Sequence, residues 1–226
     1  MSGILAGMTT RYDAVVLAGG AARRLGGTDK PALPVGGLML LDRVLAACEA
    51  AGTTVVVGPR RPTARPVRWA REEPAGGGPV PALAAGLAAL AGGPGARGPL
   101  GQGAPRVVVV LAADLPFLTA ATVGALAEAA DACAPGAAGV PEGVVLTDPD
   151  GRDQPLAAAY LVEPLRRELA LLAGEHGGLG GLPLRLLTGE LALRGMADPT
   201  GDASFDCDTW EDVAVARARL ERRSEG

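Results

Sequence analysis

A glycine-rich segment at residues 17–30 ends in Lys30, the only lysine of the chain. It reads Leu-Ala-Gly-Gly-Ala-Ala-Arg-Arg-Leu-Gly-Gly-Thr-Asp-Lys and directly follows an apolar stretch that predicts a strand at 12–18. Loops that bind anions commonly begin at such a point. A lysine ammonium is a compact charge on a flexible stem, which suits it to phosphate oxygens. The segment therefore predicts a nucleoside triphosphate site, and the alternative is a turn without a ligand.

The spacing of this segment separates it from two common nucleotide loops. It has neither the G-x-x-x-x-G-K-[ST] pattern of a P-loop nor the G-x-G-x-x-G pattern of a dinucleotide fold. Gly19 and Gly20 would let the backbone pass close to a base and ribose. Arg24 and Lys30 can then bracket a triphosphate.

Acidic side chains follow two further predicted strands. Asp114 comes after the continuous apolar run at 106–112. Asp206 and Asp208 lie two residues apart at the end of a predicted strand at 205–207, so that both project to one side. Ligands of open α/β sheets bind at the carboxyl ends of strands, and Mg²⁺ prefers oxygen ligands. Asp114 and one of the pair would suffice for Mg²⁺. The alternatives are a turn or capping aspartate before Pro116 and polar residues before a helix.

A second glycine-rich turn lies at 72–80 and leads into a predicted helix. Such a turn can approach a nucleobase or sugar, and it also occurs without a ligand. The only histidine, His176, lies among glycines with no evident partner for catalysis.

Strands and helices alternate along the chain, which indicates βαβ units. The predicted strands are 12–18, 53–57, 67–70, 106–112, 138–147, 154–160, 191–194 and 205–207. The predicted helices are 39–51, 80–90, 119–133, 162–173 and 209–222, the last opened by a capping box. Together they predict one three-layer α/β/α domain over 11–223. Its mostly parallel, Rossmann-like central sheet would carry a small antiparallel excursion at the 138–160 hairpin. Residues 1–10 are expected to be disordered, 92–105 to be a surface loop and 174–181 a glycine-rich loop.

Composition excludes several classes of protein. The chain has 226 residues, 48% of them hydrophobic, with a net charge of −4. This charge gives no basic surface for nucleic acid. The three cysteines form no C-x-x-C pair, which argues against disulfides and zinc. Neither a signal peptide nor a run of 18 apolar residues is evident, so we expect a cytoplasmic protein that does not bind membranes.

Taken in order, these segments resemble the molybdenum cofactor guanylyltransferase family of nucleotidyltransferases, which has a glycosyltransferase-A-like fold. The family's opening signature is L-A-G-G-x-x-x-R-M-G-G-x-D-K, with Leu25 here in place of methionine. Gly78-Pro79 matches its G-P-L-A-G turn and Asp114-Leu115-Pro116 its metal motif. The segment 205–212 matches its closing F-x-N-x-N-T-P-E-[DE]-L motif.

The resemblance implies transfer of GMP from GTP to the terminal phosphate of molybdopterin, with Mg²⁺ as cofactor and pyrophosphate as product. The implied catalytic residues are Arg24, Lys30 and Asp114. The implied nucleotide-binding residues are Leu17, Ala18, Gly19, Gly20, Lys30, Glu73 and Gly78. The implied metal ligand is Asp114. Asp208, which stands where the family has an asparagine, is the expected second ligand, with Asp206 as the alternative. The possible acceptor-side residues are Arg152, Arg185 and Asp206.

The chain departs from the family pattern at three places. Asp206 and Asp208 replace two asparagines, Ala82 replaces a glycine, and 175–181 lacks the arginines expected on the acceptor side. The alternatives are a cytidylyltransferase or sugar-1-phosphate nucleotidyltransferase of the same fold, or an inert domain that binds a nucleotide or partner. Expected partners are GTP and molybdopterin, with possible transient contact to enzymes that make or receive the cofactor.

Overall fold

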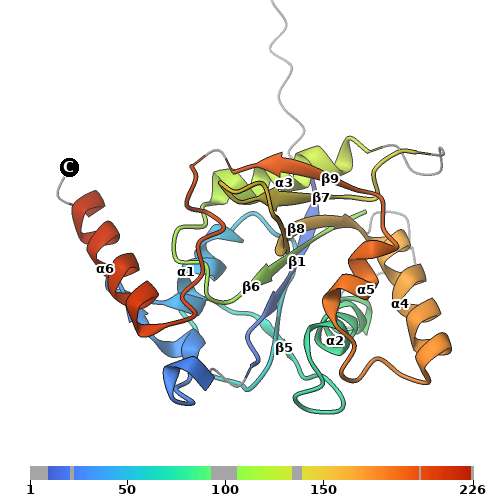
Figure 1. Cartoon of the computed structure of the whole chain (residues 1–226), viewed down its shortest axis with the longest axis horizontal. Helices are drawn as coiled ribbons and strands as arrows, with labels where there is room; N and C mark the ends of the chain where they lie inside the picture. The colour runs from blue at the N-terminus through green and yellow to red at the C-terminus, as the bar shows by residue number, and fades with distance from the viewer. Residues whose placement is uncertain (1–9, 21–22, 93–105, 134–138, 199, 225–226) are drawn as a thin grey trace, which may run out of the picture.

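A seven-stranded sheet forms the centre of the computed structural model, which describes residues 10–20, 23–92, 106–133, 139–198 and 200–224 (Figure 1). The strands in spatial order are β5 (Arg68–Ala70), β4 (Thr54–Val57), β1 (Tyr12–Leu17), β6 (Val107–Ala112), β8 (Asp153–Leu161), β7 (Gly143–Thr147) and β9 (Leu193–Ala197). Within this sheet β8 is antiparallel to both of its neighbours, and the other pairs are parallel. The mostly parallel α/β prediction is confirmed.

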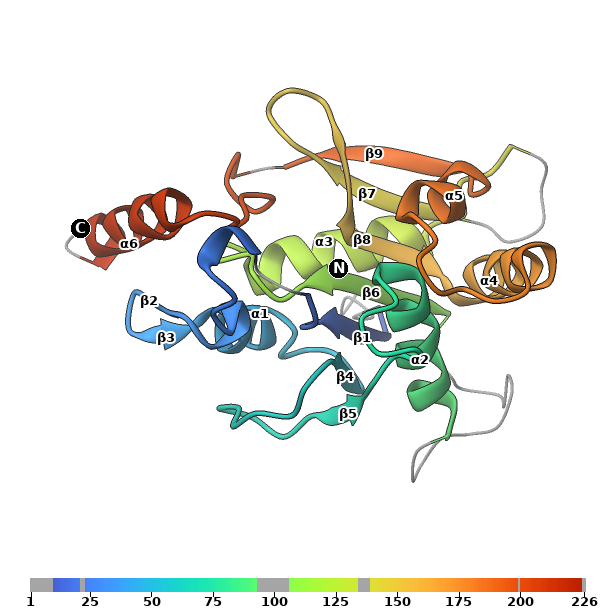
Figure 2. The same ribbon diagram turned by 60° about the horizontal axis from the view of Figure 1, so that its bottom comes forward.

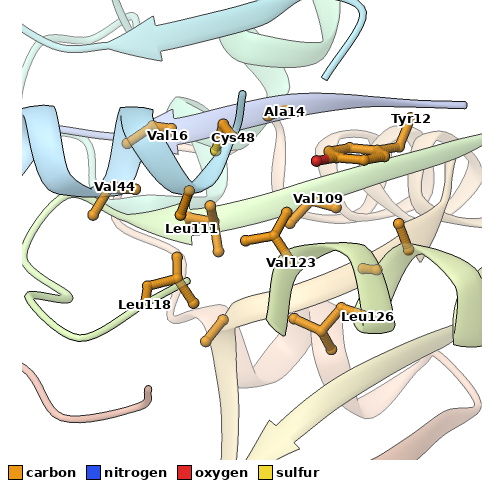
Figure 3. Packing of buried hydrophobic residues seen from close by; sticks show 14 of the residues in the cluster. Tyr12, Ala14, Val16, Val44, Cys48, Val109, Leu111, Leu118, Val123 and Leu126 are labelled. Carbon is orange, nitrogen blue, oxygen red and sulfur yellow. The ribbon is translucent and has the colours of Figure 1, made fainter. Parts of the chain in front are cut away.

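Helices cover both faces of the sheet, which explains why the central strand β6 is apolar without a break. On one face lie α1 (Leu40–Ala47) and α3 (Ala120–Asp131), and on the other α2 (Pro79–Gly92), α4 (Val162–His176) and α5 (Leu184–Gly189). Along β6, Val109 and Leu111 pack into the first layer and Val108 and Val110 into the second. Figure 3 shows Val109 and Leu111 among side chains of β1, α1 and α3.

A third apolar cluster joins the glycine-rich segment to the end of the chain. It contains Leu25, Leu33, Val35 of the short strand β2 (Pro34–Val35), which pairs with β3 (Leu38–Met39), and residues of the last helix, α6 (Trp210–Ser224). The contacts α6 makes with β2 place these distant segments side by side (Figure 2). The predicted capping box opens α6, because Thr209 N donates to Asp212 Oδ2 at 2.7 Å and Asp212 N to Thr209 Oγ1 at 3.2 Å.

The predicted hairpin is present, but it lies within the main sheet. Its second strand, β8, pairs with the central β6, with Val109 opposite Ala159. The run 157–161 is buried throughout, and such an uninterrupted apolar run is typical of an interior strand. A separate two-stranded antiparallel sheet is formed by β2 and β3, which the sequence analysis did not predict.

Other predictions need local correction. Residues 205–207 are not a strand, because they pair with no strand of the sheet. Helix α4 continues to His176 and ends at Gly177, where φ is +67°, so the loop expected at 174–181 begins later. Strand β9 begins two residues after its predicted start, and α5 was not predicted.

The disorder expected at 1–10 and the loop expected at 92–105 fall almost wholly outside the described residues. The strand expected at 138–147 is shorter than predicted: residue 138 lies outside the described residues, 139–142 are not strand, and β7 begins at Gly143. Within the described parts of the chain, none of the helices combines the length and apolar character that a membrane crossing requires.

Candidate active site

The proposed site lies where the parallel strands β4, β1 and β6 end. Their carboxyl ends share one edge of the sheet, and the chain leaves it there through the glycine-rich segment, residues 58–61 and Asp114. A pocket of about 570 Å³ opens at this edge. It is lined by Leu17, Gly19, Gly20, Pro59, Arg71, Glu72, Gly76, Gly78, Pro79, Ala82, Ala112, Asp114 and Leu156.

The glycine-rich segment turns back on itself at Gly26 and Gly27. Both have φ in the left-handed region, at +68° and +79°, which a side chain would disfavour. Just before them, Leu25 is 1% exposed in the third cluster and anchors the turn. Thr28 Oγ1 donates to the Leu25 carbonyl at 2.7 Å. The apolar residue at position 25 therefore fixes the loop, and the glycines return it toward the sheet edge.

Lys30 lies between two carboxylates from distant parts of the chain. Its Nζ forms ion pairs with Asp114 Oδ2 and, at 2.6 Å, with Asp208 Oδ1. Burial lowers the pKa of Lys30, but Asp114 and Asp208 outweigh it, and the net shift is upward. The lysine therefore stays charged. Arg24, which is largely exposed, reaches the other oxygen of Asp208 at 3.5 Å.

One carboxylate oxygen at this site fits a ligand of a magnesium ion. Asp114 Oδ1 is buried and has no hydrogen-bond partner, although Oδ2 meets Lys30. The pKa of Asp206 is raised mainly by partial burial and further by the nearby charges of Asp208 and Asp114. No group of three or more His, Cys, Asp or Glu side chains in the described residues has a metal-binding arrangement. Mg²⁺ needs only one or two carboxylates together with substrate phosphates, so Asp114 and Asp208 are an adequate set.

Cys207 lies between the two acidic residues but faces the core. It is fully buried in the third cluster, and burial raises the pKa of its thiol to about 12, helped by the charge of Asp114. It therefore packs as an apolar side chain, and Asp206 and Asp208 on either side are turned outward.

The nucleoside end of the pocket contains most of the residues that the sequence indicated. Leu17, Gly19, Gly20 and Gly78 line it. Ala18 lies behind the surface, buried, with its N–H donating to the Val57 carbonyl at 2.8 Å.

Glu72 lines the pocket, whereas Glu73 is exposed and does not. Glu72 Oε1 accepts from Gly76 N at 3.0 Å, while Oε2 is buried with no hydrogen-bond partner. A buried carboxylate oxygen without a donor is costly unless a ligand supplies one. The acidic side chain that lines the pocket is therefore Glu72, one residue before the position expected from the sequence.

Arg61 belongs to the site, and the sequence analysis did not identify it. Its guanidinium binds Asp29 through two contacts of 2.8 and 3.2 Å and donates to the Ala18 carbonyl at 3.3 Å. The available signal was its position four residues after the buried strand β4, at the edge shared with β1.

The acceptor-side candidates are not brought together. Asp206 lines a second cavity of about 390 Å³ with Asp148, Asp150 and Gln154 of the β7–β8 turn region. Arg152 is exposed and lies 3.5 Å from Asp150. Arg152 and Arg185, the latter exposed on α5, line neither this cavity nor the nucleoside pocket.

Helix α6 packs against both the segment that follows Asp114 and the segment that carries Asp206 and Asp208. The rings of Phe117, three residues after Asp114, and Phe205, next to Asp206, lie 5.6 Å apart. The Arg219 guanidinium lies 5.9 Å from the Phe117 ring and 5.2 Å from the Phe205 ring. These contacts fix the closing segment although it forms no strand.

Comparison with known proteins agrees with this geometry. The model of a family described as the MobA-like NTP transferase domain matches residues 14–188. A Rhodobacter capsulatus protein named molybdenum cofactor guanylyltransferase is 32% identical over 218 residues, which cover 95% of this chain and 99% of that protein.

Two solved structures share the fold. Molybdopterin-guanine dinucleotide biosynthesis protein A from Archaeoglobus fulgidus aligns with a TM-score of 0.65 at 19% identity, over 93% of this chain and 99% of the other. The 2-C-methyl-D-erythritol 4-phosphate cytidylyltransferase from Thermus thermophilus aligns with a TM-score of 0.61 at 18% identity, over 92% and 98%. At these identities the likeness shows the fold alone.

Proposed function

The chain belongs to the MobA-like NTP transferase family and is a nucleotidyltransferase, and on this basis we propose that it transfers GMP from GTP to the terminal phosphate of molybdopterin. Pyrophosphate is the second product. The observation that carries the proposal is the joining of Lys30 to Asp114 and Asp208 beside the pocket that contains Glu72.

Selection of guanine rests on Glu72. Guanine presents two adjacent donors, its ring N1–H and its exocyclic amino group, and an ionised carboxylate is an acceptor only. The unpartnered Oε2 of Glu72 would gain such a donor from guanine. Cytosine offers an amino group beside a ring nitrogen that only accepts, so it matches a carboxylate less well. This contact favours GTP over CTP.

Lys30 and Arg24 hold the triphosphate. Both now contact Asp208, and phosphate oxygens would replace this carboxylate as their partner. The acceptor phosphate attacks the α-phosphorus in line, and the bond to the pyrophosphate oxygen breaks. The protein supplies no nucleophile for this displacement, so catalysis comes from positioning and from stabilising the charge on the leaving pyrophosphate.

Asp114 and Asp208 would hold Mg²⁺, which when bound would neutralise phosphate charge as a Lewis acid. Asp114 Oδ1 could act as a metal ligand because no protein donor occupies its lone pairs. On the acceptor side the proposal rests on Asp206, and Arg152 and Arg185 would have to act from outside the two cavities. The three cysteines are free and buried, in keeping with a reducing compartment such as the cytoplasm.

A nucleotide panel tests the proposal. Purified protein is incubated with molybdopterin, Mg²⁺ and each nucleoside triphosphate in turn, and pyrophosphate release is followed. We expect release with GTP. Release with CTP alone would favour the cytidylyltransferase alternative, and GTP binding without release under any condition would favour an inert domain.

The Glu72→Gln and Glu73→Gln variants test base selection. Replacing one carboxylate oxygen of Glu72 by an amide nitrogen places a donor against the guanine donors, so the preference for GTP over CTP in kcat/KM should fall about tenfold or more. Glu73→Gln should keep the preference of the parent protein. If only Glu73→Gln lost the preference for GTP over CTP, base recognition would be assigned to Glu73 instead.

A further inference from the structure

Arg61 joins the two ends of the glycine-rich segment. Its Nη1 donates to the Ala18 carbonyl at the start, and its Nε and Nη2 donate to the two oxygens of Asp29 at the end. A guanidinium that binds both oxygens of a carboxylate fixes direction as well as distance. The side chain of Arg61 is only 9% exposed, so this pair is less screened by solvent than a surface ion pair.

Asp29 controls the backbone that carries Lys30. It occupies the N-cap position of the short 3₁₀ turn η2 (Lys30–Ala32), and its carbonyl accepts from Ala32 N at 2.9 Å. Aspartate at such a position usually caps with its side chain, but Asp29 makes no side-chain cap. Its carboxylate is turned to Arg61 instead. The Arg61 contact therefore orients the residue that begins the Lys30 turn.

The support for Arg61 comes from the sheet. Gly58, which follows β4, packs against Ala18, and a Cβ placed on it would lie 2.8 Å from the Ala18 carbonyl carbon and oxygen. Gly58 N also donates to the Ala70 carbonyl at 3.0 Å. Arg61 thus extends from a segment fixed against β1 and β5, and reaches the far end of the loop from there.

We infer that Arg61 is a positioning residue of the triphosphate site: by binding Ala18 and Asp29 together, it holds Lys30 where the β- and γ-phosphates bind. The inference rests on the proposed function for the identity of the nucleotide. Arg61 acts through Asp29, because its Nε, Nη1 and Nη2 are all engaged by the loop. Its effect should fall on the outer phosphates more than on the nucleoside.

Calorimetric titration with GTP and GMP separates this role from a general structural one. Arg61→Gln should weaken GTP binding about tenfold or more, and GMP binding by less than about threefold, because GMP lacks the phosphates that Lys30 holds. Arg60→Gln is the matched control. Arg60 is the exposed neighbour outside the pocket lining, so this variant should bind both nucleotides as the parent protein does.

Asp29→Asn examines the other half of the contact. Asp29 is about half exposed, and the change leaves the Ala18 contact in place, so this variant reports on the pair even if Arg61→Gln does not fold. We expect the same selective loss of GTP affinity. The double variant should bind GTP about as weakly as Arg61→Gln alone, because both changes break one interaction.

Unchanged GTP affinity in Asp29→Asn, losses that add in the double variant, or an equal loss for GMP would each overturn the inference. Failure of the proposed function looks different. A parent protein that binds CTP and not GTP would contradict the guanylyl assignment. The role of Arg61 would then be tested with CTP and CMP, and the same variants should lose affinity for CTP more than for CMP.

Discussion

Lys30 is held by two carboxylates, and in the proposed reaction phosphate oxygens would replace that of Asp208. In the free protein its ammonium meets Asp114 and Asp208, and these charges keep its pKa above the ordinary value in spite of burial. The same arrangement keeps Lys30 extended toward the sheet edge. A phosphate therefore meets a charged lysine that is already in position, which limits the reorganisation needed on binding.

Replacing Lys30 by methionine should slow turnover more than it weakens GTP binding. The lost charge acts most strongly on the leaving pyrophosphate, so kcat should fall about 10²-fold to 10³-fold, and KM should change less. Lys30→Arg keeps a charge and is the comparison variant. Steady-state pyrophosphate release measures both constants. A Lys30→Met protein with the kcat of the parent protein would remove Lys30 from catalysis.

The raised pKa of Asp206 predicts the direction in which the stability of the folded protein changes with pH. Its pKa is raised above the ordinary 3.8 by partial burial first and then by the charges of Asp208 and Asp114. The folded protein thus binds this proton more tightly than the unfolded chain does. The resulting stability is present at low pH and is lost as pH rises through the folded pKa.

At neutral pH, therefore, the Asp206→Asn variant should melt at a higher temperature than the parent protein, and the gain should shrink as pH falls toward 4. Asp150→Asn is a suitable control, because Asp150 is exposed and its ion pair with Arg152 is exposed as well. Melting curves across this pH range give the answer. A gain that grew on acidification would contradict the assignment of charge repulsion to Asp206.

Side-chain chemistry could be predicted from the sequence where the residue type is decisive. Lys30 and Asp114 were identified by charge and by position after predicted strands, and Asp208 by its charge although the strand expected before it is absent; the three side chains meet. The choice between Glu72 and Glu73 depended on which residue of an irregular turn faces inward, and no periodicity applies to such a turn. Arg61 was missed because its partner, Asp29, comes from another strand connection.

At the scale of strands and their connections, the candidate site depends on close backbone contact between the connections that follow β1 and β4. Gly58 follows β4 at φ +144° and lies directly against Ala18, so the second strand connection supports the first. The sheet edge is therefore a packed layer of backbone beside the candidate pocket, and space for a side chain is absent at this contact.

Gly58→Ala should both destabilise the protein and weaken GTP binding. The new Cβ would approach Ala18 to 2.8 Å and the backbone would remain strained, at a cost of about 1 to 3 kcal/mol in the free energy of unfolding. Gly37→Ala is the control, because φ is +81° there but no atom lies within 4 Å of the added Cβ. Denaturant unfolding and GTP titration measure the two effects. Equal GTP affinity in both variants would show that the contact does not shape the site.

Strand order was harder to predict than strand existence. Most helices and strands were expected near their observed positions, since apolar periodicity indicates them. The insertion of β8 beside β6 follows from pairing between strands that are distant in the chain, which local patterns do not report. The expected strand at 205–207 failed for a similar reason: its residues are fixed by Phe117 and α6, and no strand edge accepts them.

On the scale of the whole molecule, the candidate site combines residues inside the segment matched by the family model with residues that follow it. The match ends at residue 188, whereas Asp206, Asp208 and α6 lie beyond it. The third cluster packs α6 on the start of the chain, and the Lys30 ion pairs complete the connection. In the proposed transfer, the full described fold would be needed, with the donor nucleotide at one end of the sheet edge and the acceptor beside Asp206.

The most direct test of the proposed transfer follows the α-phosphate of GTP. Protein, Mg²⁺ and molybdopterin are incubated with GTP labelled at that phosphate, and the products are separated and weighed by mass spectrometry. The account predicts label in a molybdopterin guanine dinucleotide, with one pyrophosphate released per dinucleotide and no reaction when a chelator removes the metal. Label that remains in GTP, or that appears only as free GMP, would contradict it.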